Sequence, residues 1–285
     1  MTADVSRPPS PSTQTSPETL SLVAFTADHI SGAHRLSQAA GWPHRPQDWE
    51  LLLGTSVGVV ALSRGQVVGT ALCSLFGDVA ALNMIIVDEQ MRGRGLGRRL
   101  MTEVIALAQS REMRLCATTD GLPLYQKLGF VKTGTVMQFQ GIAKAGTPAH
   151  RIELGTAADI AKLAQMDHDS NGMDRHGLLM QIAQDARILL AQNGFALVRP
   201  FGRGYVVGPI VASDCTVALS LLAQAGTLCA GQFLRVDMAP NAAMEQQAVG
   251  LGLDYVGGGT TMVHSARPRP VSAFTTYAIA AQALG

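Results

Sequence analysis

A glycine- and arginine-rich segment near residue 95 has the composition of a phosphate-binding loop. The apolar, strand-length run Leu82–Val87 precedes it, and apolar residues recur at helical spacing from Leu96 onward. Backbone N–H groups in such a loop, with a helix N-terminus behind them, form a binding site for a pyrophosphate. Gly93, Gly95 and Gly97 let the main chain approach the anion closely. Further phosphate contacts are expected from the arginines of the segment: Arg92, Arg94, Arg98 and Arg99.

Two common phosphate-binding motifs do not fit this segment. A P-loop ends in Gly-Lys-Ser/Thr, whereas Arg98 follows Gly97 here. A dinucleotide fingerprint needs a third glycine at its sixth place, and counting from Gly93 that place is Arg98. The order that fits is Arg92-x-x-Gly95-x-Gly97 after a strand. An ordinary basic turn or a nucleic-acid-binding patch is the alternative interpretation.

This order resembles the acetyl-coenzyme A loop of the GCN5-related N-acetyltransferase (GNAT) superfamily. The later segment Gly121–Phe130 is similar to the superfamily's Leu-Tyr-x-x-Leu-Gly-Phe element and follows at the usual separation. The resemblance covers about residues 20–141 and implies acetyl-coenzyme A (acetyl-CoA) as co-substrate, with no metal. The residues that it assigns to the coenzyme are Ile85, Ile86, Val87, Arg92, Gly93, Arg94, Gly95, Leu96, Gly97, Arg98 and Thr118.

The chemistry that this resemblance implies has three requirements. The acceptor amine must lose a proton, the oxyanion needs hydrogen-bond donors, and the departing thiolate needs a proton. The resemblance assigns the main chain of Ile85–Val87 to the thioester carbonyl and Tyr125 to the thiolate, because a phenol is neutral at pH 7. A buried anchoring role for Tyr125 is the alternative. Thr118 stands where many members have Asn, so a hydroxyl replaces an amide contact. The strand Leu82–Val87 contains no carboxylate, and Asp78 is one candidate for the base.

Two further groups of residues are candidates for binding the acceptor. Residues 41–49 contain both tryptophans of the chain together with a histidine and an aspartate, and aromatic faces with a carboxylate suit a cationic amine. The alternative is that Trp49 packs in the core while the others begin a helix. An acidic cluster at residues 167–174 is the second group, and a solvated loop is its alternative. The candidates are Trp42, His44, Asp48 and Trp49 in the first group and Asp167, Asp169 and Asp174 in the second.

Length and composition limit the classes of protein to which the chain can belong. Its 285 residues are enough for two domains, and 47% hydrophobic with 15% charged residues suits a well-buried globular protein. A net charge of +1 argues against nucleic-acid or membrane partners attracted by charge alone. Four cysteines without metal spacing, and no signal-peptide pattern, favour a cytoplasmic protein with reduced thiols. A homodimer is left open.

The order of predicted elements repeats along the chain. We expect an α/β (α+β) fold with two tandem GNAT-like domains, each a mixed, mostly antiparallel sheet flanked by helices. The second domain has no arginine-glycine loop and is expected to be degenerate. We also expect helices at Met173–Leu190 and Phe274–Leu284. The expected boundaries are a disordered tail at 1–19, a catalytic domain at 20–143, a linker at 144–150, the degenerate domain at 151–266 and a C-terminal tail at 267–285.

The expected function is transfer of acetyl from acetyl-CoA directly to the primary amine of a small polar molecule. The whole-chain pattern, including Gly41–Trp49, is similar to bacterial two-domain acetyltransferases, among them the kind that acetylates the 2′-amino group of the aminoglycoside kasugamycin and so confers resistance. Another amine metabolite or a protein is an alternative acceptor. A non-catalytic module that binds acetyl-CoA and regulates a partner is an alternative of a different class.

Overall fold

The structure is a computed structural model and describes residues 20–285, so the tail expected at 1–19 lies outside the described residues. The elements of the first half are β1 (Leu20–Ala24), α1 (Ile30–Ala39), α2 (Pro46–Thr55), β2 (Ser56–Ser63), β3 (Gln66–Phe76), β4 (Val79–Val87), α3 (Leu96–Ala108), β5 (Glu112–Ala117), α4 (Leu122–Lys127) and β6 (Val131–Ile142). Those of the second half are β7 (Glu153–Leu154), α5 (Ile160–Asn171), α6 (His176–Ile182), β8 (Arg187–Ala191), β9 (Gly194–Phe201), β10 (Gly204–Ala212), α7 (Cys215–Leu228), β11 (Phe233–Met238), α8 (Ala242–Gly250), β12 (Asp254–His264) and β13 (Thr275–Ala278). Short 3-10 turns lie at Ala27–His29, Glu89–Met91 and Ala157–Asp159.

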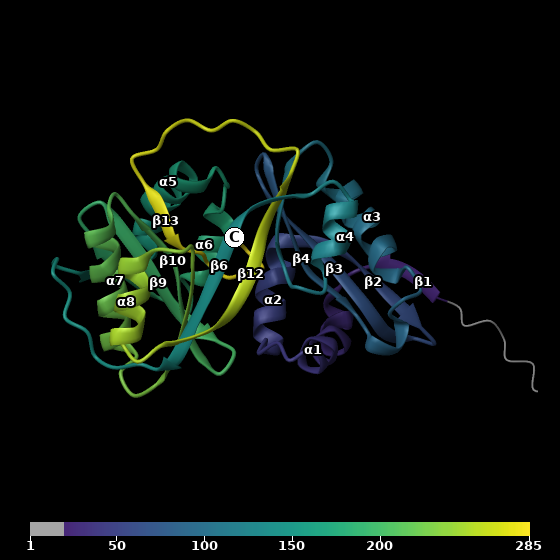
Figure 1. The fold of residues 1–285 in the computed structure, drawn as a ribbon, viewed down its shortest axis with the longest axis horizontal. Helices are drawn as coiled ribbons and strands as arrows, with labels where there is room; N and C mark the ends of the chain where they lie inside the picture. Colours follow the sequence, from purple (N-terminus) through teal and green to yellow (C-terminus); the bar gives the residue numbers. More distant parts are fainter. Residues whose placement is uncertain (1–19) are drawn as a thin grey trace, which may run out of the picture.

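The two halves share one mixed, mostly antiparallel sheet (Figure 1). Its strand order is β1-β2-β3-β4-β5-β12-β6-β11-β13-β10-β9-β8-β7. Strand β12 of the second half lies between β5 and β6 of the first, and β6 in turn pairs with β11 of the second. Each half therefore completes its sheet with a long strand from the other half.

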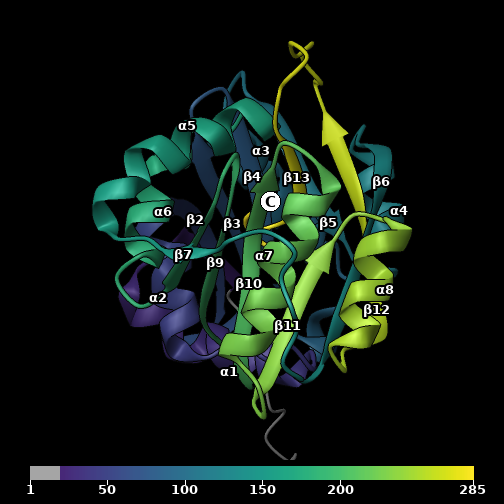
Figure 2. The same cartoon turned by 90° about the vertical axis from the view of Figure 1, so that its left-hand side faces the viewer.

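Helices cover both faces of this sheet. Helix α3 packs on one face of the first half because Leu96, Leu100, Val104 and Ala108, which recur every four residues, are all buried. On the second half α7 and α8 lie side by side over one face (Figure 2). Helices α1, α2, α5 and α6 contribute to one core that contains residues of both halves. The halves are thus joined by a shared core as well as by exchanged strands.

Two sequence-based expectations about secondary structure are wrong. The helix expected at Met173–Leu190 ends at Ile182, and Arg187–Ala191 forms β8, which pairs with β9. The segment expected to be a helix at Phe274–Leu284 contains β13, which pairs with β10 and β11. The strands β8 and β13 have only five and four residues, and segments this short do not distinguish a strand from a helix by their periodicity.

The expected C-terminal tail is therefore part of the fold. Ala278, Ala280, Ala281 and Leu284 are buried, and the last residues run into the middle of the molecule (Figure 1). Within residues 20–285, no helix has the length and apolar character needed to cross a membrane. In the same part of the chain, no group of three or more His, Cys, Asp or Glu side chains is placed to hold a metal ion.

Candidate active site

Strands β4 and β5 are parallel neighbours that separate partway along their length. They pair at three positions, the last being Ala81 with Arg114, although β4 continues to Val87. The register between β3 and β4 shifts between Asn83 and Ile86, beyond the last position paired with β5, and Met84 has a positive φ of 50°. Such an irregularity bends a strand away from its neighbour. Beyond Ala81, the edge of β4 that faces β5 has no ladder partner in the described chain, so its backbone groups can bind a ligand.

The glycine-rich loop lies at the open end of this gap. Gly93 and Gly95 both have φ of +75°, and a Cβ at either position would meet nothing within 4 Å. Glycine is therefore favoured at both positions by the left-handed backbone conformation and not by a lack of space for a side chain. Gly95 is the N-cap of α3 and provides no side-chain cap. The first N–H groups of α3 therefore have no side-chain acceptor from this residue and are available to an anion.

A pocket of about 830 Å³ joins the loop to the gap between the strands. Ten of the eleven residues expected to bind the coenzyme line it. Arg94 does not line it, and its guanidinium instead lies 3.9 Å from the sulfur of Met91. Residues that the motif analysis did not assign complete the wall: Ala40, Met91, Thr119, Asp120, Gly121 and Leu124. Gly121 and Leu124 belong to the same signature as Tyr125, so the sequence did contain a signal for them.

Tyr125 also lines this pocket and is almost wholly buried, with 6% of its surface exposed. Burial, with a smaller effect from Cys116, raises the pKa of Tyr125 to about 12. Its ring packs edge-on against Phe130 at a centroid distance of 6.3 Å. The hydroxyl of Thr118 accepts a hydrogen bond of 3.2 Å from the backbone N–H of Gly121 and so fixes the turn before α4. The phenol is therefore held neutral, and its ring is fixed by packing at the wall of the pocket.

The aromatic segment at residues 41–49 serves mainly to join the two halves. Trp42 lines the same pocket as the glycine-rich loop, and its contact with an acceptor stays a prediction. Trp49 does not line this pocket: it is fully buried, stacks on Phe25 and donates from its indole N–H to the Ser37 hydroxyl at 3.2 Å. The prediction that Trp49 contacts an acceptor is corrected to a core role. Hydrophobic packing across α1 and α2 is the reason.

Asp48 is also buried, and His44 is partly buried. The Asp48 carboxylate accepts hydrogen bonds from Arg45 at 2.9 Å and from the backbone N–H of Gly202 at 3.3 Å, and Arg199 lies 3.7 Å away. It therefore connects α2 to the turn between β9 and β10 and has no capacity left for an acceptor cation. His44 packs against Phe201, and burial lowers its pKa to about 4. Its Nδ1 finds no hydrogen-bond partner within the described chain.

Asp78, the candidate for the base, lies far from the glycine-rich loop. Asp78 precedes β4 at the opposite end from the glycine loop, is 86% exposed and pairs with Arg267 at 3.3 Å. At about 3.3 Å per residue, the eight residues from Asp78 to Ile86 span about 26 Å. Asp78 is therefore too distant to act as the base on an amine at Ile86, and that expectation is corrected.

Of the acidic cluster at residues 167–174, Asp167 has a structural role. Asp167 and Arg175 are both fully buried and form an ion pair with an Nη2–Oδ1 distance of 2.6 Å. The same guanidinium donates to the Leu284 carbonyl at 3.0 Å, so the pair fixes the end of the chain. Asp169 accepts from Gln165 on the surface of α5, and Asp174 accepts from the backbone N–H of His176. Burial and the ion pair with Arg175 correct the expectation that Asp167 binds an acceptor amine, whereas for the exposed Asp169 and Asp174 that role stays a prediction.

The second half has no equivalent gap between its parallel strands, because strand β13 lies between them. Strands β10 and β11 pair in parallel at Tyr205–Val207, as β4 and β5 do, and then separate. Strand β13 lies between them there, with Ala278 opposite both Ile210 and Met238. A Cβ on Gly208 would collide with the carbonyl of Ile279, so the two segments approach closely. A pantetheine arm could not occupy this gap while β13 is in place.

Comparison with known proteins agrees with this architecture. Sequence models of the acetyltransferase (GNAT) domain match residues 54–132 and residues 163–278. The chain is 28% identical over 281 residues to the uncharacterized N-acetyltransferase YitH of Bacillus subtilis, covering 93% of this chain and 98% of that protein. It is 31% identical over 121 residues to the N-alpha-acetyltransferase RimI of Mycobacterium tuberculosis, covering 40% of this chain and 77% of RimI.

A solved structure shares the whole fold. The crystal structure of a putative acetyltransferase from Pyrococcus horikoshii superposes with a TM-score of 0.79 at 21% identity, covering 93% of this chain and 96% of that one. Because both halves of the present chain match the same domain family, the fold and the general activity follow. The chain belongs to the GNAT superfamily and is an acetyl-CoA-dependent N-acetyltransferase with two tandem domains.

Proposed function

We propose that the first domain transfers acetyl from acetyl-CoA directly to the primary amine of a small polar molecule. One observation supports this proposal above the others. The unpaired edge of β4, the N-terminus of α3 and the buried Tyr125 all line the same pocket. The N–H groups of the loop and helix bind the pyrophosphate. The main chain of Ile85–Val87 donates to the thioester carbonyl as it becomes an oxyanion. Tyr125 gives its proton to the departing thiolate.

The acceptor amine loses its proton to solvent in this proposal. Among the described residues that line the coenzyme pocket, Asp120 is the acidic one, and it is largely exposed with its carboxylate 3.9 Å from Arg92. A small acceptor is favoured over a protein because the second half, packed against α2 and β5, restricts access to the gap. The finer proposal is that the acceptor is an aminoglycoside, with the 2′-amino group of kasugamycin as the specific candidate.

We expect the purified protein to add one acetyl group to kasugamycin, and its expression to protect growing bacteria from the drug. The test is a panel of amines with acetyl-CoA, with thiol release and product mass as readouts. The panel contains kasugamycin, other aminoglycosides, polyamines, amino acids and a short peptide with a free N-terminus. Efficient turnover of another amine, without acetylation of kasugamycin, would retain the general proposal and remove the drug assignment. Efficient turnover of the peptide alone would favour a protein acceptor.

We also expect one molecule of coenzyme A to bind per chain, because β13 occupies the corresponding gap of the second half. Isothermal titration calorimetry measures this stoichiometry directly. A value near two would mean that β13 leaves its position or that coenzyme binds the second half in another way.

A further inference from the structure

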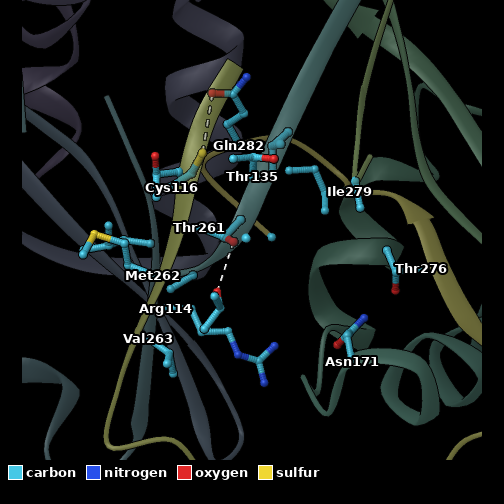
Figure 3. A pocket seen from close by; sticks show the side chains of 18 of the residues that line it. Arg114, Cys116, Thr135, Asn171, Thr261, Met262, Val263, Thr276, Ile279 and Gln282 are labelled. Atoms are coloured by element: carbon cyan, nitrogen blue, oxygen red, sulfur yellow. Dashed lines mark hydrogen bonds between the residues drawn. The ribbon is translucent and has the colours of Figure 1, made fainter. Parts of the chain in front are cut away.

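A second large cavity lies between the two halves of the molecule (Figure 3). Its volume is about 860 Å³, within the range of sites that enclose a small molecule. Strand β5 lines one side, and the segment around β13 lines another with Thr276, Ile279 and Gln282. The cavity is therefore built by both domains and exists because the end of the chain folds back between them.

This cavity meets the closed end of the gap that separates β4 from β5. Leu82 and Leu115, which follow the last paired positions of the two strands, both line it. The coenzyme pocket begins at Ile85 on the same strand. Leu82 and Ile85 are three residues apart, which corresponds to about 10 Å along a strand. The two pockets therefore lie along the same strand, and an acceptor in this cavity would approach a thioester held at Ile85 from the side of Leu82.

More basic than acidic residues line the cavity. Glu112 is the acidic residue in the described lining, and the basic residues are Arg114, Lys132, Arg267 and Arg269. Glu112 is buried and accepts hydrogen bonds from Arg114 Nε at 2.6 Å, Arg269 Nη2 at 2.9 Å and the Arg267 backbone N–H at 2.7 Å. Although burial alone would raise the pKa of Glu112, these hydrogen bonds and charges outweigh it and lower the pKa. Glu112 is therefore ionised and fully occupied by its partners.

Arg114 retains an unused donor beside the cavity. Its Nη2 is buried and has no hydrogen-bond partner among residues 20–285. The side chain extends from β5 toward the side where Asn171 lies (Figure 3). A buried N–H group without an acceptor is costly in a folded protein, and a bound ligand commonly satisfies it. A guanidinium prefers a carboxylate or phosphate oxygen, to which its hydrogen bonds are charge-assisted.

We propose that this cavity binds the acceptor and that the acceptor carries an anionic group, a carboxylate or a phosphate, in addition to the amine that is acetylated. Arg114 binds the anionic group, and Arg269 adds to the positive potential around it. This proposal rests on the small-molecule transferase function proposed above and narrows its substrate class. Kasugamycin bears a carboxylate as well as amino groups and belongs to this class, whereas kanamycin, a polycation without a carboxylate, does not.

The test uses pairs of amines that differ in the anionic group. The pairs are L-lysine with cadaverine, glucosamine 6-phosphate with glucosamine, and kasugamycin with kanamycin. We expect the anionic member of at least one pair to be acetylated with a kcat/KM at least about 10-fold above that of its partner, the range of one charge-assisted hydrogen bond. The first and second pairs distinguish a carboxylate from a phosphate as the preferred group.

Variants then connect this preference to the cavity. Arg114→Gln should raise the KM for the anionic acceptor by about 10- to 100-fold and leave the KM for acetyl-CoA unchanged. Arg269→Gln, whose side chain is 43% exposed, should act in the same direction if Arg114→Gln fails to fold. Arg151→Gln is the matched control, because it removes one positive charge from an exposed ion pair with Glu153 and lies outside the cavity lining.

The outcomes separate this proposal from the one on which it depends. Equal acetylation of both members of every pair, or an unchanged KM in both cavity variants, would overturn the anionic acceptor while acetyl transfer to small amines still stands. If no amine of any kind is acetylated although acetyl-CoA binds, the transferase proposal for small molecules fails, and the substrate class fails with it.

Discussion

Replacing Gly95 with aspartate is expected to abolish binding of acetyl-CoA. Gly95 is exposed at the N-cap of α3 with φ of +75°, on the wall of the coenzyme pocket. The new carboxylate would face the pyrophosphate, and two like charges 4 Å apart repel by about 4 kcal/mol at an effective dielectric constant of about 20. We therefore expect calorimetry with coenzyme A to show a loss of affinity of more than about 100-fold.

Gly231→Asp provides a matched control for this variant. Gly231 is also exposed, has φ of +78°, and a Cβ there would meet nothing within 4 Å, but it lies between α7 and β11 in the second half. Both variants place an aspartate in a left-handed conformation, which this residue tolerates better than most. If Gly95→Asp binds coenzyme A as tightly as Gly231→Asp and the wild-type protein do, the loop does not bind the pyrophosphate.

Replacing Tyr125 with phenylalanine is expected to lower kcat by about 100-fold with little change in the KM for acetyl-CoA. Loss of one positioned proton donor costs a factor in this range, and a group that acts in the transition state affects kcat more than substrate binding. The ring remains, so its packing against Phe130 is retained. Tyr255→Phe is the control, because that tyrosine is 57% exposed and does not line the pocket. A decrease of less than threefold would assign Tyr125 a structural role.

The pH dependence of kcat gives a second test of the same residue. A tyrosine acts as an acid while its phenol is protonated, and an ordinary tyrosine loses that proton near pH 10. Because burial raises the pKa of Tyr125 to about 12, the phenol stays protonated throughout the range from pH 7 to about 11. We expect no decrease of kcat on the alkaline side over this range. A decrease with an apparent pKa near 10, absent in Tyr125→Phe, would show that the phenol is not shifted.

The sequence predicted most of the first half correctly because its signals are local. The pattern of strand, glycine loop and amphipathic helix at residues 82–108 corresponds to β4, the loop and α3. Positive φ values at Gly93 and Gly95 depend on the residue type at that position, and the spacing of Leu96 and Leu100 directs one face of α3 to the sheet. Short-range information of this kind was sufficient to predict ten of the residues that line the pocket at this loop.

Long-range pairing decided which polar residues are available for chemistry. Asp48 and Trp49 have the residue types of an acceptor site, but Arg199 and Gly202, about 150 positions later in the chain, bind the Asp48 carboxylate. The partner of the Asp167 carboxylate, Arg175, is only eight positions away, but the burial of the pair depends on the end of the chain, where the Leu284 carbonyl accepts from the same guanidinium. A pattern of neighbouring residues does not contain the burial or the distant partner of a charge, so these side chains could not be distinguished from a binding site in advance.

By itself the sequence determined the superfamily, the glycine-rich loop before α3 and the absence of such a loop from the second half, since each depends on residues that are adjacent in the chain. The tertiary structure alone decided that β12 completes the first half, that β13 fills the gap of the second, and that Arg114 borders a cavity between them. The physical reason is that strands pair through backbone hydrogen bonds, which nearly every residue can form. The strand with which a segment pairs therefore depends on the packing of the whole sheet more than on the residues of that segment.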